Sequence, residues 1–474
     1  MTHSRHRRFT GILRTVVQTP RLGARAADAQ AAELRRAPYL QGQRPDGITI
    51  RWRTDATVRH SSILRYGRDF NRLDQALAAT EFSVHYPGVR DWQARLEGLE
   101  PDSTYYYSVE ADGATLCGAD AQHRFRTAPA PGAARRMRFL LLGDCGSNRP
   151  REDDLASALA ADGPADPIRV RNGFRKFNAD RDLDGIILLG DNAYPLGTDE
   201  MYQAALFQVY ADELRHTPLW PCTGNHDIDG AYTHLFTADR SGRPGGAASK
   251  GALYYSVDLG NLHLMVFDPW ISWWQESTNP DHPAWRKQFE WIRENLRTAD
   301  NEWLVAVNHF PMYCAGNYRS DDGLLADLRK RMVPLFDEAG VDLAVAGHDH
   351  TYQRSRLIAG HLGGADTFSA EAHLMAEGDG RDAPIFKEPV PGGGTMYVVS
   401  GTAGGVRPFG NFDHPAMVTF DAPEGKRGGL AVPGCTVIEV DGLTLRGWQV
   451  GVDGRPLDHF TLVHRHARKK SAAE

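Results

Sequence analysis

Five apolar runs of the sequence are each followed at once by a side chain that can bind a metal ion. The runs are MRFLLL, DGIILL, PLWPCT, EWLVAV and VDLAVA, and the side chains that follow are Asp144, Asp191, Asn225, His309, and the pair His348 and His350. In four of the five loops a glycine stands just before the metal-competent residue, and glycine lets a backbone turn sharply and approach closely. Taken singly, each aspartate or asparagine would be a turn former and each histidine a structural residue. The ordered set predicts a shared metal site.

The residue types indicate which metals would bind. Carboxylate, amide oxygen and imidazole suit manganese, zinc and iron, so no cysteine is needed. Tyr194 lies three residues after Asp191 in the stretch LLGDNAYPLG (188–197) and is a further candidate oxygen ligand. The alternative for Tyr194 is packing of its ring against the strand ends. A free phenol ionises only near pH 10, so binding as a phenolate requires a strong Lewis acid such as trivalent iron.

Apolar runs that alternate with helical patterns predict an α/β region from about residue 136 onward. The apolar runs are typical of buried strands, and the helical patterns lie at 199–215, 283–298 and 324–339. In open α/β sheets, ligands bind outside the carboxyl ends of the strands. We therefore expect the metal-competent side chains to converge on one rim of the sheet.

Residues 37–128 show a different, all-β pattern. ITIRWRT (48–54) alternates apolar and polar residues, the period of a half-buried strand, and several short strand patterns follow it. The stretch LEGLEPDSTYYYSVEA resembles the corner of a fibronectin type III domain, on the basis of Leu96, Leu99, Pro101, Thr104, Tyr105 and Tyr107. We expect a fibronectin III-like β-sandwich here, followed by an Ala/Pro/Gly-rich linker at 129–135.

Composition excludes several other classes of protein. At 474 residues the chain predicts two or more domains. A net charge of −6 provides no basic field for nucleic acid, and no apolar run is long enough to cross a bilayer. The five cysteines lack any C-x-x-C spacing, which argues against both a disulfide framework and a zinc–thiolate site.

The metal-competent motifs resemble those of the calcineurin-like metallophosphoesterases and, within them, the purple acid phosphatases. Gly146 stands where many other metallophosphoesterases have a histidine, and Tyr194 stands where the purple enzymes place a tyrosinate on Fe(III). GHDHTYQRS (347–355) and TMYVVSGTAGG (395–405) also look like family stretches. The resemblance covers about residues 37 to 464. It implies an α/β metallophosphoesterase domain at 136–464, with an α/β/β/α sandwich, behind the N-terminal β-sandwich.

The same resemblance implies two metal ions. The first, Fe(III), would be held by Asp144, Asp191, Tyr194 and His350. The second, a divalent zinc, manganese or iron ion, would be held by Asn225, His309 and His348, with Asp191 bridging the two. A carboxylate has two oxygens and can span two ions about 3.5–4 Å apart.

The implied reaction is hydrolysis of small-molecule phosphate monoesters by attack of a metal-bound hydroxide. His226 follows a ligand directly and is the candidate general acid; the adjacent Asp227 would raise its pKa if the side chains meet. The alternative is that His226 only orients phosphate. Family members often have further histidines after the position of His309, whereas FPMYCAGNYRSDDG contains none. Tyr318 or Arg319 is therefore a candidate phosphate contact.

Several alternatives stay open. A phosphodiesterase or nucleotide-cleaving enzyme would use nearly the same ligands, and a binding or adhesion protein could retain the fold without activity, although the intact ligand set argues against that. His414 would either reach the site or lie on the surface, and the aromatic stretch PWISWW (269–274) would either line a substrate cleft or cover the sheet edge.

Both ends of the sequence predict tails. Residues 1–36 carry eight arginines and two acids and predict a disordered basic segment; residues 465–474 predict a second tail. The family resemblance favours a place outside the cytoplasm. The apolar part of residues 1–36 is broken by Arg14, however, and fits a secretion signal poorly. The sequence does not predict an oligomeric state.

Overall fold

The fold is seen in a computed structural model that describes residues 32–58, 61–82, 86–146, 167–227, 230–237, 253–270, 283–420, 425–426 and 428–469. Most of the predicted basic tail, residues 1–31, lies outside them. The first strand begins at Leu34, inside the segment predicted to be disordered. That prediction was wrong for residues 34–36, because Arg36 is buried by an ion pair described below.

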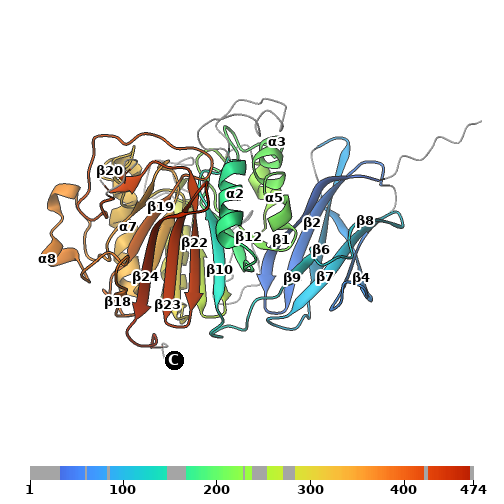
Figure 1. The fold of residues 1–474 in the computed structure, drawn as a ribbon, viewed down its shortest axis with the longest axis horizontal. Helices are drawn as coiled ribbons and strands as arrows, with labels where there is room; N and C mark the ends of the chain where they lie inside the picture. The colour runs from blue at the N-terminus through green and yellow to red at the C-terminus, as the bar shows by residue number, and fades with distance from the viewer. Residues whose placement is uncertain are drawn as a thin grey trace, which may run out of the picture. The chain divides into compact units, whose positions relative to one another are not determined.

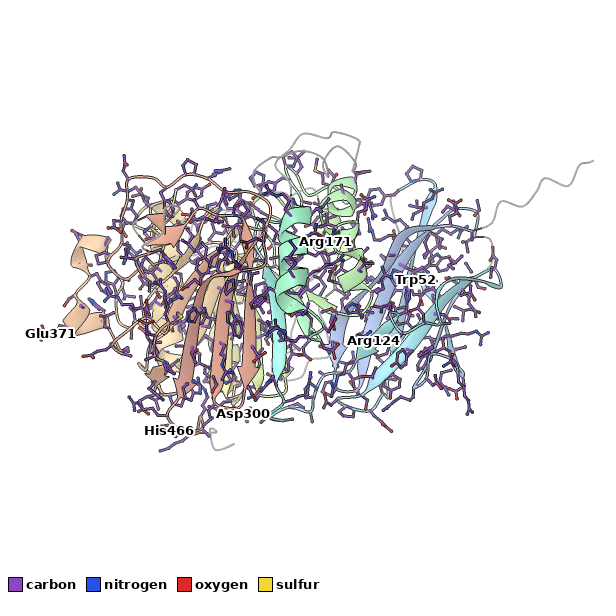
Figure 2. All side chains as sticks on the ribbon, viewed as in Figure 1. Trp52, Arg124, Arg171, Asp300, Glu371 and His466 are labelled. Atoms are coloured by element: carbon purple, nitrogen blue, oxygen red, sulfur yellow. The ribbon has the colours of Figure 1, made fainter. Side chains whose placement is uncertain are left out.

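The strands before residue 128 form the predicted β-sandwich. One sheet holds β1(Leu34–Arg44), β2(Gly47–Asp55), β6(Val89–Leu96) and β5(Thr80–Phe82); the other holds β4(Gln75–Ala78), β3(Ser62–Gly67), β7(Thr104–Ala111), β8(Ala114–Gly118) and β9(Arg124–Arg126). Alternate residues of β2, ending in Trp52, and of β7 fill the core between the sheets. Trp52 is fully buried on β2 (Figure 2).

The first sheet does not stop at the end of the sandwich. β1 pairs in parallel with β12(Pro218–Trp220), with Leu40 opposite Pro218. The sheet then continues through β11(Gly185–Leu188), β10(Met137–Leu142), β22(Gly434–Asp441), β23(Thr444–Gly451), β24(Pro456–His464) and β18(Ile385–Lys387), giving 11 strands. The C-terminal strands therefore lie beside β10, although they are distant in sequence (Figure 1). The two regions share one sheet, where the sequence predicted only a linker.

A second sheet of eight strands packs against this one. Its order is β13(Tyr255–Leu259), β14(Leu262–Val266), β15(Trp303–Val307), β16(Leu343–Ala346), β19(Met396–Ser400), β17(Tyr352–Arg354), β21(Gly429–Leu430) and β20(Gly425–Lys426). Side chains alternate in direction along a strand. Accordingly Val305 and Val307 join the core shared with β10 and β11, whereas Leu304 and Ala306 face the opposite way.

Helices cover the outer faces of the two sheets. α2(Pro167–Asn178) contacts β22 and β23, while α6(Pro283–Thr298) and α7(Gly323–Ala339) pack on the outer face of the second sheet. The order helix, sheet, sheet, helix confirms the predicted fold class. The predicted helix at 199–215 is divided into α3(Asp199–Tyr202), a π-helical turn η1(Gln203–Phe207) and α4(Ala211–Leu214). The remaining short helices are α5(Ala231–Leu235), η4(Ala365–Thr367) and α8(Ala370–His373).

The polar face of β2 is buried rather than solvated. Arg53 donates to both carboxylate oxygens of Asp91, each at 2.8 Å, and also pairs with Asp199. Arg36 of β1 donates to Asp199 at 3.0 Å. Arg51 donates to the carbonyl oxygen of His234 at 2.7 Å. The arginines of the sandwich therefore bind the segments that begin α3 and contain α5.

The C-terminal tail is shorter than predicted. Arg468 donates to the buried carboxylate of Asp342 at 2.9 Å and to the carbonyl oxygen of Glu302 at 3.1 Å, so the chain packs against the second sheet at this point. Across the described residues, no helix combines the length and apolar character needed to cross a membrane.

Asp199→Ala should destabilise the protein strongly. The substitution leaves Arg36 buried without its carboxylate, and breaking a buried ion pair on one side costs about 3–5 kcal/mol. Urea unfolding of the two proteins measures the difference. Glu81→Ala, which breaks the exposed pair of Glu81 with Arg90, is the control and should cost no more than about 1 kcal/mol. Equal effects of the two substitutions would contradict a structural role for the buried pair.

Candidate metal centre

Asp144 and Asp191 lie side by side at the rim of the 11-stranded sheet. They follow β10 and β11, which are adjacent and parallel, so both strands end at the same edge. Both residues have positive φ angles, 55° and 53°, which turn the chain sharply out of its strand. One oxygen of each carboxylate accepts a backbone N–H at 2.8 Å, that of His348 for Asp144 and that of His226 for Asp191. The second oxygen of each therefore remains directed to a shared centre.

Tyr194 brings its hydroxyl group to this centre. The hydroxyl oxygen is 3.0 Å from Asp144 Oδ1, Asp191 Oδ2 and His350 Nε2. One hydroxyl proton cannot be donated to both carboxylates at once. Burial, and then the two carboxylates, raise the pKa of Tyr194 well above that of a free phenol. Ionisation of Tyr194 would therefore need a cation at the same place.

A second group of candidate metal ligands lies beside the first and consists of Asn225, His309 and His348. Asn225 Oδ1 is 3.2 Å from His309 Nε2 and 3.1 Å from His348 Nδ1. His309 Nδ1 donates to the carbonyl oxygen of Leu189 at 2.8 Å, which directs Nε2 to Asp191 Oδ2 at 3.3 Å. Burial lowers the pKa of His348 well below its ordinary value, and a neutral imidazole is the form that binds metals.

The donor atoms converge as a metal site requires. Ligand atoms of Asp144, Asp191 and His309 all lie within 4.8 Å of one another. Although burial opposes ionisation, His309 lowers the pKa of Asp191 below its usual range and keeps the carboxylate charged. Ionised carboxylates, a neutral imidazole and an amide oxygen match the ligand preferences of zinc, manganese and iron. The residues present therefore fit a metal ion.

The glycine before Asn225 is required by the closeness of the donors. A Cβ on Gly224 would overlap the Asp191 carboxylate and the backbone nitrogen of Asp191. Only a residue without a side chain lets these two loops meet, which explains one of the glycines noted in the sequence.

His226 lies at the edge of the centre, partly exposed. Its ring packs on Tyr194 with the centroids 4.7 Å apart. Nδ1 is 2.8 Å from the carbonyl oxygen of Pro195. Because a carbonyl only accepts, Nδ1 carries a proton and Nε2 is left to face other groups. Asp227 does not take the part suggested for it, since its carboxylate accepts from Tyr202, Gly224 and Asn192 instead.

The sequence alone did not identify Asp349 as a residue that supports the loop of Tyr318. The buried Asp349, between the two histidines of GHDH, accepts the backbone N–H of Tyr318 at 3.2 Å. Tyr318 stacks on His348, with a centroid distance of 4.3 Å and an angle of 21°. Arg319, the other candidate phosphate contact, pairs instead with Asp322 at 3.2 Å. The position of Asp349 between two ligand histidines was the signal available for its role.

His414 is neither at the metal centre nor on the surface. Its ring is 1% exposed and packs against Tyr313, His361 and Phe368. The surface alternative was therefore wrong, because the late loop folds inward over this aromatic cluster. Most of the stretch PWISWW lies outside the described residues; its Trp270 stacks on Phe310 at 5.5 Å.

Comparison with known families agrees with the fold and the site. A family model for the calcineurin-like phosphoesterases matches residues 137–352, a range that contains all seven expected ligand positions. The fold and site thus define a metallophosphoesterase. A second model, for the N-terminal domain of purple acid phosphatases, matches residues 37–127. The two matches identify the chain as a calcineurin-like metallophosphoesterase of the purple acid phosphatase type.

Individual relatives are distant. The chain is 25% identical over 332 residues to the probable purple acid phosphatase 20 of Arabidopsis thaliana, covering 65% of this chain and 66% of the relative. It is 27% identical over 249 residues to acid phosphatase type 7 of Mus musculus, covering 49% of this chain and 54% of the relative. The match thus spans about half to two thirds of these relatives. A purple acid phosphatase from yellow lupin (Lupinus luteus) seeds has a similar fold, with a TM-score of 0.65, 17% identity, and coverage of 90% of this chain and 74% of that chain.

The buried His414 should make stability depend on pH. Burial, with Arg329 nearby, lowers the pKa of His414 to about 3, whereas an unfolded histidine titrates near 6.5. The unfolded chain therefore binds the proton first, so the free energy of unfolding falls as the pH drops from about 6.5 to 3. The loss from this group between pH 7.5 and pH 5 should be about 2 kcal/mol.

Urea unfolding of wild type and His414→Gln at both pH values measures this contribution. The variant should lose about 2 kcal/mol less than wild type between the two pH values. His459→Gln changes an exposed histidine and should follow wild type. Parallel behaviour of His414→Gln and wild type would contradict a neutral buried His414.

Proposed function

We propose that the protein is a binuclear-metal phosphomonoesterase acting on small-molecule phosphate esters. The observation that carries the proposal is the meeting of two carboxylates, a phenol, an amide and three imidazoles at one sheet rim. Its family supports phosphate-ester hydrolysis as the reaction class.

The contacts divide the donors into two groups, which supports two metal positions. In the first group, Asp144, Asp191 and His350 all contact the Tyr194 hydroxyl. In the second group, His309 and His348 both contact the amide oxygen of Asn225. Asp191 Oδ2 lies between the groups, at 3.0 Å from Tyr194 and 3.3 Å from His309. We assign the first group to Fe(III), the second to divalent zinc, manganese or iron, and the bridge to Asp191.

When bound, two such cations lower the pKa of water toward about 7 and neutralise charge on phosphoryl oxygens. The chain supplies the remaining parts of the reaction. Because Nδ1 of His226 is held on the carbonyl oxygen of Pro195, Nε2 is left for substrate. We assign to Nε2 the proton that the leaving alcohol takes up. The backbone N–H groups of His226 and His348 keep both carboxylates oriented while substrate enters.

Hydrolysis of p-nitrophenyl phosphate compared with bis-p-nitrophenyl phosphate tests the function. Wild type should turn over the monoester faster. Asp191→Asn should lower kcat by about 100-fold or more, the scale for removing one group that stabilises the transition state. Glu81→Gln, at an exposed carboxylate, should retain full activity. Preference for the diester would favour a phosphodiesterase, and no hydrolysis of either ester with both metals bound would overturn the proposal.

Tyr194→Phe tests the assignment of Fe(III). The substitution removes the hydroxyl that contacts both carboxylates and keeps the ring. A phenolate on ferric iron requires that oxygen, so the variant should lose the visible absorption of the iron-loaded protein and bind less iron. Absorption spectra and elemental analysis of both proteins provide the measurement. Unchanged absorption with full iron content would show that Tyr194 is not a ligand.

A further inference from the structure

A loop on the His348 side of the metal centre presents Tyr318. Two contacts fix this loop. Asp349 accepts the backbone N–H of Tyr318 at 3.2 Å. The N–H of Gly410, in the loop after β19, donates to the carbonyl oxygen of Gly316 at 2.8 Å. The Tyr318 ring lies flat on the His348 ring at 4.3 Å. Tyr318 is therefore fixed directly beside a candidate metal ligand.

The loop after β19 presents Arg407 at the same side. A Cβ on Gly404 would overlap the carbonyl oxygen of Asp144, so this loop passes directly against the metal centre. The backbone N–H of Arg407 donates to the carbonyl oxygen of His350 at 3.0 Å. The backbone of Arg407 is thus anchored to a candidate ligand, and Arg407 itself is exposed.

Tyr318 and Arg407 form a pair that lacks an anion. The positive charge of Arg407 lies near enough to Tyr318 to act on its hydroxyl group. A guanidinium and a phenol hydroxyl can both donate hydrogen bonds to an anion. Within the described part of the chain, Arg407 has no carboxylate partner. Arg319 differs, because it is neutralised by Asp322 at 3.2 Å and lies over the Phe412 ring at 5.0 Å.

We propose that Tyr318 and Arg407 form an oxyanion subsite that binds a terminal oxygen of a phosphate monoester and so selects monoesters over diesters. This inference rests on the proposed function and names the residues that set its substrate class. Two neighbouring donors, one of them charged, match the geometry and charge of a phosphoryl oxygen.

The selection follows from the number of terminal oxygens. A monoester has three terminal oxygens and carries nearly two negative charges at neutral pH. A diester has two terminal oxygens and one charge, and its second ester group would replace the oxygen that faces the subsite. Two terminal oxygens can face the metal positions in both substrates. Only a monoester then has a third for Tyr318 and Arg407.

Arg407→Gln tests the subsite, with Arg319→Gln as the matched control. Arg407→Gln should lower kcat/KM for p-nitrophenyl phosphate by about 10- to 100-fold, the range for a lost charged hydrogen bond. It should lower kcat/KM for bis-p-nitrophenyl phosphate by less than about 3-fold. Arg319→Gln should match wild type with both esters. Tyr318→Phe, which keeps the ring, should shift the ratio of the two substrates in the same direction as Arg407→Gln.

Calorimetric titration with inorganic phosphate provides a readout that does not need turnover. Metal content is first measured and matched among the proteins. Arg407→Gln should weaken phosphate binding by about 10-fold or more, and dimethyl phosphate binding should change little. Unchanged phosphate affinity, or equal losses of kcat/KM for both esters, would overturn the subsite.

The two proposals can fail separately. If wild type hydrolyses the monoester and Arg407→Gln behaves as wild type, the subsite is wrong and the phosphomonoesterase function stands. If wild type hydrolyses neither ester but Arg407→Gln weakens phosphate binding, the oxyanion subsite stands and the proposed function is wrong.

Discussion

The rest of the site depends on holding two buried carboxylates against each other. Asp144 and Asp191 both approach the Tyr194 oxygen to 3.0 Å, and like charges at such distances repel strongly away from water. Each carboxylate has one oxygen fixed by a backbone N–H from another loop. That leaves two negative oxygens facing the centre, and a single phenol proton between them. Positive charge beside these oxygens balances the arrangement, and either a proton on His309 or a bound cation would supply it.

The N-terminal sandwich contributes to this arrangement although it contains none of the candidate ligands. Through β1 and β12 it extends the sheet whose rim carries the centre. Its arginines bind Asp199, five residues after Tyr194, and the backbone of α5, a few residues after His226. Two of the loops that bear site residues are therefore fixed at their far ends by the sandwich. A shared sheet and buried ion pairs make the two regions one structural unit, which explains why polar side chains alternate along β2 without facing water.

Much of this was predictable from short sequence patterns. Apolar runs predicted the strands, and the glycine–ligand pairs after them predicted which residues meet at the rim. What could not be predicted depended on partners remote in sequence. Arg36 looked like part of a basic tail because its partner, Asp199, lies far along the chain. His414 looked exposed because its aromatic neighbours come from two segments that are remote in sequence, around Tyr313 and around 361–368. Arg407 was missed because its meaning depends on Tyr318, which comes from a different loop.

Protons and metal ions compete for the same atoms at this centre. Despite burial, which opposes protonation, Asp191 raises the pKa of His309 to about 9, so at neutral pH the empty donor set keeps a proton between these two side chains. The proton partly neutralises the carboxylate that would bridge two metals. A cation that binds His309 Nε2 must displace it, because a metal ligand has to offer a free lone pair. A second metal that used His309 as a ligand would therefore bind less tightly as the pH falls, whereas His348 is already neutral and would lose no proton on binding. The two pKa values differ because burial and the charge of His309 dominate at His348, whereas Asp191 and Asp144 outweigh burial at His309.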